Sequence, residues 1–90
     1  MARAIWLPEA LEAVDAIRAY IQQFDPQAAQ RVTDRLIRAG YSLRDFPSRG
    51  RPSASGLREL VTVPPYVLRY LVVGDMVYIA TIKHGPQRRG

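Results

Sequence analysis

The chain has 90 residues, of which 48% are hydrophobic and 23% are charged, and its formal net charge is +5. A chain of this length can build only one core, so we expect a single domain over residues 1–90, and the composition argues against collagen-like and disordered proteins. No uncharged stretch approaches the roughly 18 to 20 residues of a membrane-spanning helix, so we expect no membrane partner.

The chain contains no cysteine and one histidine, His84. The lack of thiolates and of a second imidazole excludes disulfides, thiol nucleophiles, sulfur-ligated metals and the HExxH motif. We therefore expect neither a metal site nor a cofactor. The N-terminal segment becomes acidic at Glu9, before the apolar core of a signal peptide could form, which favours a cytoplasmic protein.

The positive charge is unevenly distributed along the chain. Twelve of the thirteen basic residues are arginine, and Lys83 is the exception. Residues 1–45 contain six arginines and six acidic residues, whereas residues 46–90 contain seven basic residues against Glu59 and Asp75. The excess therefore lies in the second half. This favours a polyanionic or acidic protein partner, although a solvated arginine-rich face without a partner would explain the same count.

The first half predicts a strand followed by two helices. Residues 2–7 form a short apolar segment typical of a strand, and apolar residues over 7–24 then recur every three or four positions, as on one face of an α-helix. Asp25 and Pro26 predict the cap and the first turn of a second helix, whose apolar stripe covers 29–43. The short connection predicts an antiparallel helical hairpin.

The second half predicts a loop and three strands. Residues 47–56 are rich in proline, glycine and serine and predict an exposed loop. Residues 57–63, 66–73 and 76–84 are rich in Val, Ile, Leu, Tyr and Thr and predict strands. The expected fold class is α+β, with a helical hairpin packed on a mainly antiparallel sheet in the order β-α-α-β-β-β.

A series of short motifs runs in order through nearly the whole chain. They are Trp6-Leu7-Pro8-Glu9-Ala10, Ile17 with Tyr20-Ile21, Asp25-Pro26 with Ala28-Ala29, Pro47 with Gly50-Arg51, Gly56 to Val61, Tyr66 to Tyr70, Gly74-Asp75, and Ile82-Lys83-His84-Gly85. Their order and spacing resemble the RelE/ParE superfamily, the toxins of type II toxin-antitoxin systems. The resemblance implies a RelE/ParE-like fold and a toxin held inactive by a cognate antitoxin, whose extended and helical C-terminal segment wraps the toxin.

The resemblance covers two kinds of toxin with different chemistry. RelE-like members cut mRNA on the ribosome, using basic residues and often a C-terminal tyrosine to drive attack of the ribose 2′-hydroxyl. ParE-like members poison DNA gyrase, so that cleaved DNA accumulates. In this sequence Val67 follows Tyr66 where the nucleases carry an arginine, Leu71 replaces a second arginine, and no tyrosine follows His84. These departures favour the ParE-like branch and DNA gyrase as the target. The alternatives are a RelE-like ribosome-dependent mRNA endonuclease and a non-toxic antitoxin-binding module.

The candidate site residues are the basic side chains of the second half. Histidine exchanges protons near neutral pH, so His84 is either a general acid or base, and then the one candidate for catalysis, or a structural residue at the sheet edge. Arg58 and Arg69 lie on successive strands and could share the open face of the sheet, where they would bind carboxylates of the antitoxin or acidic groups of the target. The alternative is a salt bridge with Glu59, Asp75 or Asp45. The expected partner-binding residues are Arg49, Arg51, Arg58, Arg69, Lys83, His84, Arg88 and Arg89.

Overall fold

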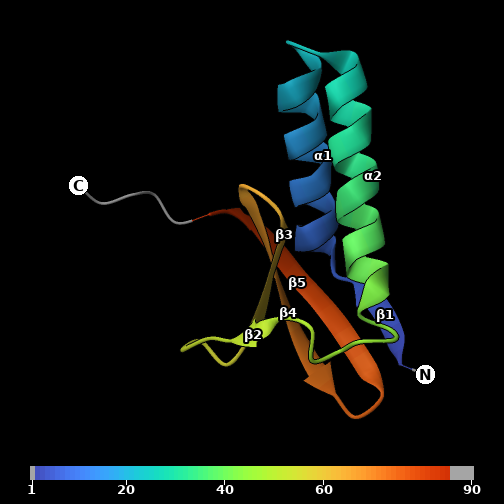
Figure 1. Cartoon of the computed structure of the whole chain (residues 1–90), viewed down its shortest axis with the longest axis vertical. Helices are drawn as coiled ribbons and strands as arrows, with labels where there is room; N and C mark the ends of the chain where they lie inside the picture. The colour runs from blue at the N-terminus through green and yellow to red at the C-terminus, as the bar shows by residue number, and fades with distance from the viewer. Residues whose placement is uncertain (1, 86–90) are drawn as a thin grey trace.

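The computed structural model describes residues 2–85, which form a helical hairpin whose base packs on a five-stranded sheet (Figure 1). The elements are β1 (Arg3–Trp6), α1 (Pro8–Gln22), α2 (Pro26–Ser42), β2 (Arg51–Pro52), β3 (Arg58–Val63), β4 (Tyr66–Val73) and β5 (Met76–His84). The predicted α+β class and element order are confirmed, and β2 is a short additional strand inside the predicted loop. None of the helices in the described residues is both long and apolar enough to span a membrane.

The starts of both helices follow from their first residues. Pro8 occupies the first turn of α1, where its missing N–H leaves no hydrogen bond unmade, and the preceding Leu7 offers no side-chain cap. Helix α2 has a true cap, because the Asp25 Oδ1 accepts a hydrogen bond from the Ala28 amide at 3.1 Å. A capping side chain of this kind stabilises a helix by about 1 kcal/mol. Helix α1 ends at Gln22 and α2 begins at Pro26, and this short connection makes the two helices antiparallel neighbours.

The sheet has the order β1-β5-β4-β3-β2. Strands β3, β4 and β5 are antiparallel neighbours, whereas β1 pairs with β5 in parallel and aligns Arg3 with Met76 and Trp6 with Ile79. The first strand therefore lies at one edge of the sheet, beside the last. Helix α1 packs against β5 and α2 packs against β3, so the hairpin bridges the sheet at its base.

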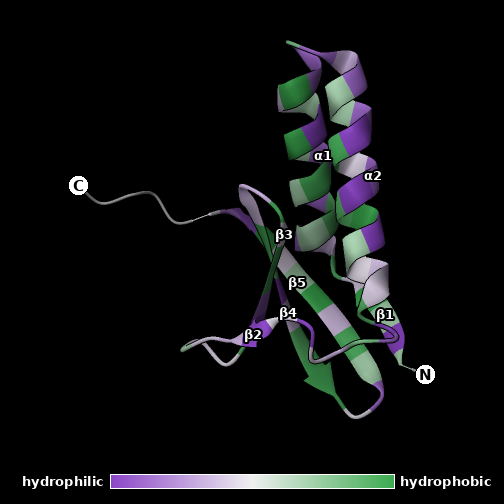
Figure 2. Ribbon diagram, viewed as in Figure 1, coloured by the Kyte–Doolittle hydropathy of each residue, from purple (hydrophilic) through white to green (hydrophobic). Residues whose placement is uncertain are grey.

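The hydrophobic core lies between the sheet and the base of the hairpin. Figure 2 shows hydrophobic residues on the surfaces of the helices and strands that meet there and hydrophilic residues along the outer side of α2. The largest fully buried side chains are Tyr70, Leu36, Leu43, Leu68, Ile79 and Val77. The far end of the hairpin extends beyond the sheet (Figure 1), and Tyr20 and Phe24 there are 62% and 71% exposed.

Helix α2 meets β1 at a close contact between Gly40 and Trp6. A Cβ atom at Gly40 would lie only 2.2 Å from Cζ2 of the Trp6 ring and 2.9 Å from Cδ1 of Ile79. Glycine in a helix costs about 1 kcal/mol relative to alanine. Here the missing side chain is what allows the helix to lie directly on the indole ring.

The start of the 47–56 loop is fixed to the sheet by Tyr70. Its buried hydroxyl donates a hydrogen bond to the Pro47 carbonyl oxygen and accepts one from the Gly50 amide, both at 2.8 Å. Arg58 donates to the same segment, from Nε to the Gly50 carbonyl at 3.0 Å and from Nη2 to the Ser48 carbonyl at 3.2 Å. Four hydrogen bonds from two strands therefore hold this part of the loop in place.

We predict that Gly40→Ala lowers the free energy of unfolding by about 1–3 kcal/mol, because the added methyl group overpacks the contact with Trp6. On helix propensity alone the same change would stabilise the protein by about 1 kcal/mol. Urea denaturation followed by circular dichroism measures the sign of the change in the free energy of unfolding. The loss should shrink in a Trp6→Leu background, which removes the clashing ring atoms, and an equal loss in both backgrounds would contradict the assignment.

We predict that Tyr70→Phe lowers the free energy of unfolding by about 1–3 kcal/mol, because it leaves the Gly50 amide and the Pro47 carbonyl without their hydroxyl partner. Amide hydrogen exchange at Gly50 should accelerate more than exchange in α1. Tyr20→Phe is the matched control, since that ring is exposed and the described contacts give its hydroxyl no hydrogen bond. Equal effects of the two substitutions would show that the Tyr70 hydroxyl does not hold the loop.

Candidate functional site

The structure separates the two arginines that were expected to lie together. In the pairing of β3 with β4, Arg58 is opposite Tyr70 and Glu59 is opposite Arg69. Because neighbouring residues of a strand point to opposite faces of a sheet, Arg58 and Arg69 lie on different faces. The prediction that they share the open face is therefore wrong, since sequence proximity of the strands does not reveal their register.

Both of these arginines have partners within the chain. The Arg69 Nε lies 3.4 Å from Glu59 Oε2, and its Nη2 donates to the Ser55 hydroxyl at 3.0 Å. Arg58 is occupied by the carbonyl oxygens of the loop, as described above. The alternative that Arg69 forms a salt bridge within the chain is thus confirmed. A role for either residue in binding a partner stays a prediction.

The other predicted residues are spread over the loop and the ends of the sheet. Arg51 and Lys83 are exposed on β2 and β5. Arg49 is also exposed, and its guanidinium donates to the Ser42 hydroxyl at 2.7 Å and to the Thr62 hydroxyl at 3.2 Å. Arg88 and Arg89 lie outside the described residues. Those predicted residues that the structure describes therefore do not form one compact site.

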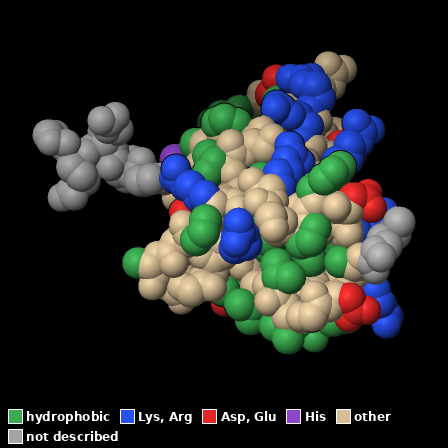
Figure 3. Space-filling model, turned by 60° about the horizontal axis from the view of Figure 1, so that its bottom comes forward, with side chains coloured by type: hydrophobic (Ala, Val, Ile, Leu, Met, Phe, Trp, Pro, Cys, Tyr) green, Lys and Arg blue, Asp and Glu red, His purple; other side chains and the backbone are tan. Residues whose placement is uncertain are grey.

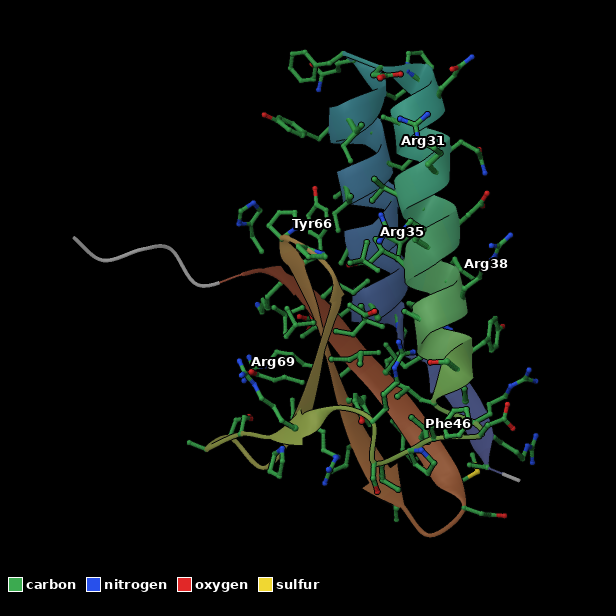
Figure 4. All side chains as sticks on the ribbon, viewed as in Figure 1. Arg31, Arg35, Arg38, Phe46, Tyr66 and Arg69 are labelled. Atoms are coloured by element: carbon green, nitrogen blue, oxygen red, sulfur yellow. The ribbon has the colours of Figure 1, made fainter. Side chains whose placement is uncertain are left out.

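His84 lies at the end of β5 in a hollow that we name the α1–β5 groove. The His84 ring meets the Tyr66 ring edge to face, with 5.8 Å between their centroids. Figure 4 shows Tyr66 at the start of β4, beside α1. The groove has a volume of about 330 Å³ and is lined by Ala13, Ala16, Ile17, Tyr20, Tyr66, Ile82 and His84.

The chemistry of this groove is mainly apolar. Among the described residues that line it, only His84, Tyr20 and Tyr66 have polar side-chain atoms. Val67, at the position where the nucleases carry an arginine, is only 5% exposed. The described residues also contain no group of three or more His, Cys, Asp or Glu side chains placed to hold a metal ion. The groove is therefore suited to binding an apolar segment.

Sequence analysis missed a basic surface on the first half of the chain. Arg31, Arg35 and Arg38 lie along the exposed side of α2, and we call them the α2 arginine face (Figure 4). Figure 3 shows basic side chains following one another over the part of the surface that the helices form. Their spacing of four and three residues was the available signal, and counting charge by halves of the chain concealed it.

The α2 arginine face continues into a cleft between α2 and β3. Arg35 and Arg38 line this cleft from the helix, and Arg49 and Thr62 line it from the loop and the sheet. Its volume is about 220 Å³, and Ala39 and Val63 complete its lining. The cleft thus brings three guanidinium groups from two separate segments of the chain to one surface.

Comparisons with known proteins agree with the fold and the motifs. Residues 4–89 match the family described as the ParE toxin of the type II toxin-antitoxin system parDE. The chain is 51% identical over 84 residues to Toxin RelE2 of Caulobacter vibrioides, covering 93% of this chain and 96% of the relative. It is 40% identical over 88 residues to the putative toxin Y4kP of Sinorhizobium fredii, covering 96% and 91%.

The fold has a counterpart among solved structures. The chromosomal ParDE toxin-antitoxin system from P. aeruginosa contains a chain that matches with a TM-score of 0.82 and 23% identity, covering 96% of this chain and 97% of that one. At this identity the likeness concerns the fold. The family match extends over almost the whole chain, and the motifs, the element order and the relatives agree with it, so the chain belongs to the ParE toxin family of type II toxin-antitoxin systems.

Proposed function

We propose that this toxin acts by binding DNA gyrase and trapping cleaved DNA, and that a cognate antitoxin neutralises it. The observation that carries the proposal concerns residues 2–85, in which the side chains that RNA cleavage would need are dispersed. Such cleavage requires an acid, a base and cations around one phosphate. Here His84 lies in an apolar groove, while Arg58 and Arg69 are occupied on opposite faces of the sheet.

Two other interpretations compete with gyrase binding. The relatives named RelE support the toxin family without separating gyrase from the ribosome as the target. A RelE-like mRNA endonuclease would have to use His84 with groups other than Arg58 and Arg69. A non-toxic antitoxin-binding module would need only the surface that binds the antitoxin.

We place the antitoxin in the α1–β5 groove. Ala13, Ala16, Ile17 and Tyr20 share one side of α1, and the two small alanines leave room above β5 for an apolar side chain from a partner. Protein interfaces have apolar, aromatic-rich centres with charged residues at the rim, which matches this groove and the basic residues around the sheet. The occupant is an amphipathic antitoxin segment with its apolar side toward α1.

The target is tested by two assays on the same purified toxin. We expect it to inhibit supercoiling of relaxed plasmid by gyrase and to accumulate cleaved DNA, while translation in a cell extract continues. Toxin premixed with antitoxin is the control and should leave gyrase active. Cleavage of ribosome-bound mRNA with unimpaired gyrase would support the endonuclease, and activity in neither assay would support the non-toxic module.

His84→Ala separates the two mechanisms further. If the toxin acts on gyrase, the substitution should leave growth inhibition within about threefold, because no proton transfer is involved. Loss of a general acid or base from an endonuclease would lower the rate by about 10²–10⁴. Circular dichroism shows whether the variant is still folded, because His84 lines the proposed antitoxin groove and antitoxin affinity alone would not separate folding from binding. Loss of toxicity in a folded variant would contradict the gyrase proposal.

The antitoxin site is tested by Ala16→Arg, which fills the groove with a charged side chain. We expect antitoxin affinity, measured by calorimetry, to fall at least about tenfold, since a buried unpaired charge is strongly unfavourable. The same substitution at Ala19 is the matched control, because that alanine is also exposed on α1 and lies outside the groove lining. Equal affinities of the two variants would place the antitoxin elsewhere. The antitoxin itself is sought as an adjacent reading frame with an acidic C-terminal half.

A further inference from the structure

The α2 arginine face has the geometry of a continuous cationic strip. Residues 31, 35 and 38 fall within a sector of about 60° around the helix axis and extend along roughly 10 Å of it. They occupy the side of α2 that faces away from the buried residues Ala29, Leu36 and Gly40. Figure 4 shows the three labelled side chains following one another along α2.

The helical hairpin is segregated by charge. Helix α1 carries three acidic residues and one arginine, whereas α2 carries three arginines and one acidic residue, Asp34. Asp34 accepts a hydrogen bond from the Gln30 side chain at 3.0 Å. Within residues 2–85, the contacts of the structure give Arg31, Arg35 and Arg38 no acidic partner. Their positive charge is therefore available to a ligand.

A fourth guanidinium is positioned next to this strip. Arg49 is held over the α2–β3 cleft by the hydroxyls of Ser42 and Thr62. Both acceptors are uncharged, so the hydrogen bonds orient the guanidinium without neutralising it. Arg35 and Arg38 line the same cleft. An anion in the cleft would thus meet cations from both the helix and the loop.

The composition of this surface favours a phosphodiester backbone over an acidic protein segment. Protein interfaces are depleted of charged residues at their centres, although arginine itself is enriched there, whereas nucleic-acid interfaces are polar and strongly positive. The α2 arginine face consists of charged residues. Of the exposed aromatic rings of the hairpin, Tyr20 and Phe24 lie on α1 and beyond its end. The third, Tyr41 on α2, contacts Trp6 and Arg44. Arginine also suits phosphate because its planar fork donates two parallel hydrogen bonds.

We infer that Arg31, Arg35 and Arg38, together with Arg49, form a binding site for the phosphate backbone of duplex DNA. The site rests on the proposed function for its biological setting, since DNA held by gyrase presents such a backbone beside a bound toxin. The contact is sequence-independent, because guanidinium groups on phosphates position a protein without reading bases. The site contributes affinity for the DNA within the gyrase complex.

The test measures binding of the purified full-length toxin to a short fluorescent DNA duplex by anisotropy at several salt concentrations, without gyrase. In the variant with Arg31, Arg35 and Arg38 all changed to Gln, affinity should fall at least about tenfold and the slope of log K against log salt should decrease by about 3. Glutamine preserves helix propensity, and circular dichroism verifies the fold.

The matched control changes Arg3, Arg18 and Arg44 to Gln, which removes the same charge from exposed positions outside the strip. Its affinity should fall less than about threefold. Equal losses in the two triple variants would overturn the site in favour of net charge. If poly-glutamate competes as strongly as unlabelled DNA, the partner is a carboxylate-rich one. If the toxin binds single-stranded RNA more tightly than the duplex, duplex DNA is not the ligand. Each of these two results would also overturn the inference.

The inference and the proposed function fail separately. If the wild type binds DNA through the strip but leaves gyrase active, the DNA site stands and the gyrase target falls. If the toxin poisons gyrase and the Arg31, Arg35 and Arg38 variant does so equally, with unchanged DNA affinity, the site falls and the gyrase target stands.

Discussion

The contact between Gly40 and Trp6 determines how the helical hairpin sits on the sheet. With no side chain at Gly40, α2 lies directly on the indole ring of β1, and α1 then follows β5. The base of the hairpin is buried at this point, while its tip extends past the sheet and leaves Tyr20 and Phe24 exposed (Figure 1). The groove along α1 and the arginine face of α2 both result from this placement.

Local features of the fold could be predicted from the sequence because they depend on neighbouring residues. Asp25 and Pro26 mark the start of α2, and the changes of hydrophobic period mark the strands. The parallel pairing of β1 with β5 joins the two ends of the described chain, and no local pattern encodes it. The two-residue strand β2 likewise depends on its partner β3 rather than on its own composition.

The candidate site was less predictable, because it depends on register and on charge in three dimensions. Arg58 and Arg69 are separated by the alignment of Glu59 with Arg69, which strand propensity cannot specify. The charge count over residues 1–45 gave zero because the acidic residues of α1 offset the arginines of α2. A count for each helix would have revealed the basic strip, since helix boundaries were already clear from the sequence.

The two proposed surfaces use different interactions: the α1–β5 groove offers apolar contact, and the α2 arginine face offers positive charge. The α1–β5 groove offers apolar area near Tyr66, whereas the arginines lie along α2 (Figure 4). An antitoxin segment that fills only the groove gains affinity from apolar burial and leaves the cationic strip open to phosphate. To block DNA contact as well, the antitoxin must carry acidic residues across β3 into the α2–β3 cleft, where carboxylates would compete with phosphate for Arg35, Arg38 and Arg49. If both proposed sites operate, neutralisation of this toxin requires steric exclusion at one side of the hairpin and charge competition at the other.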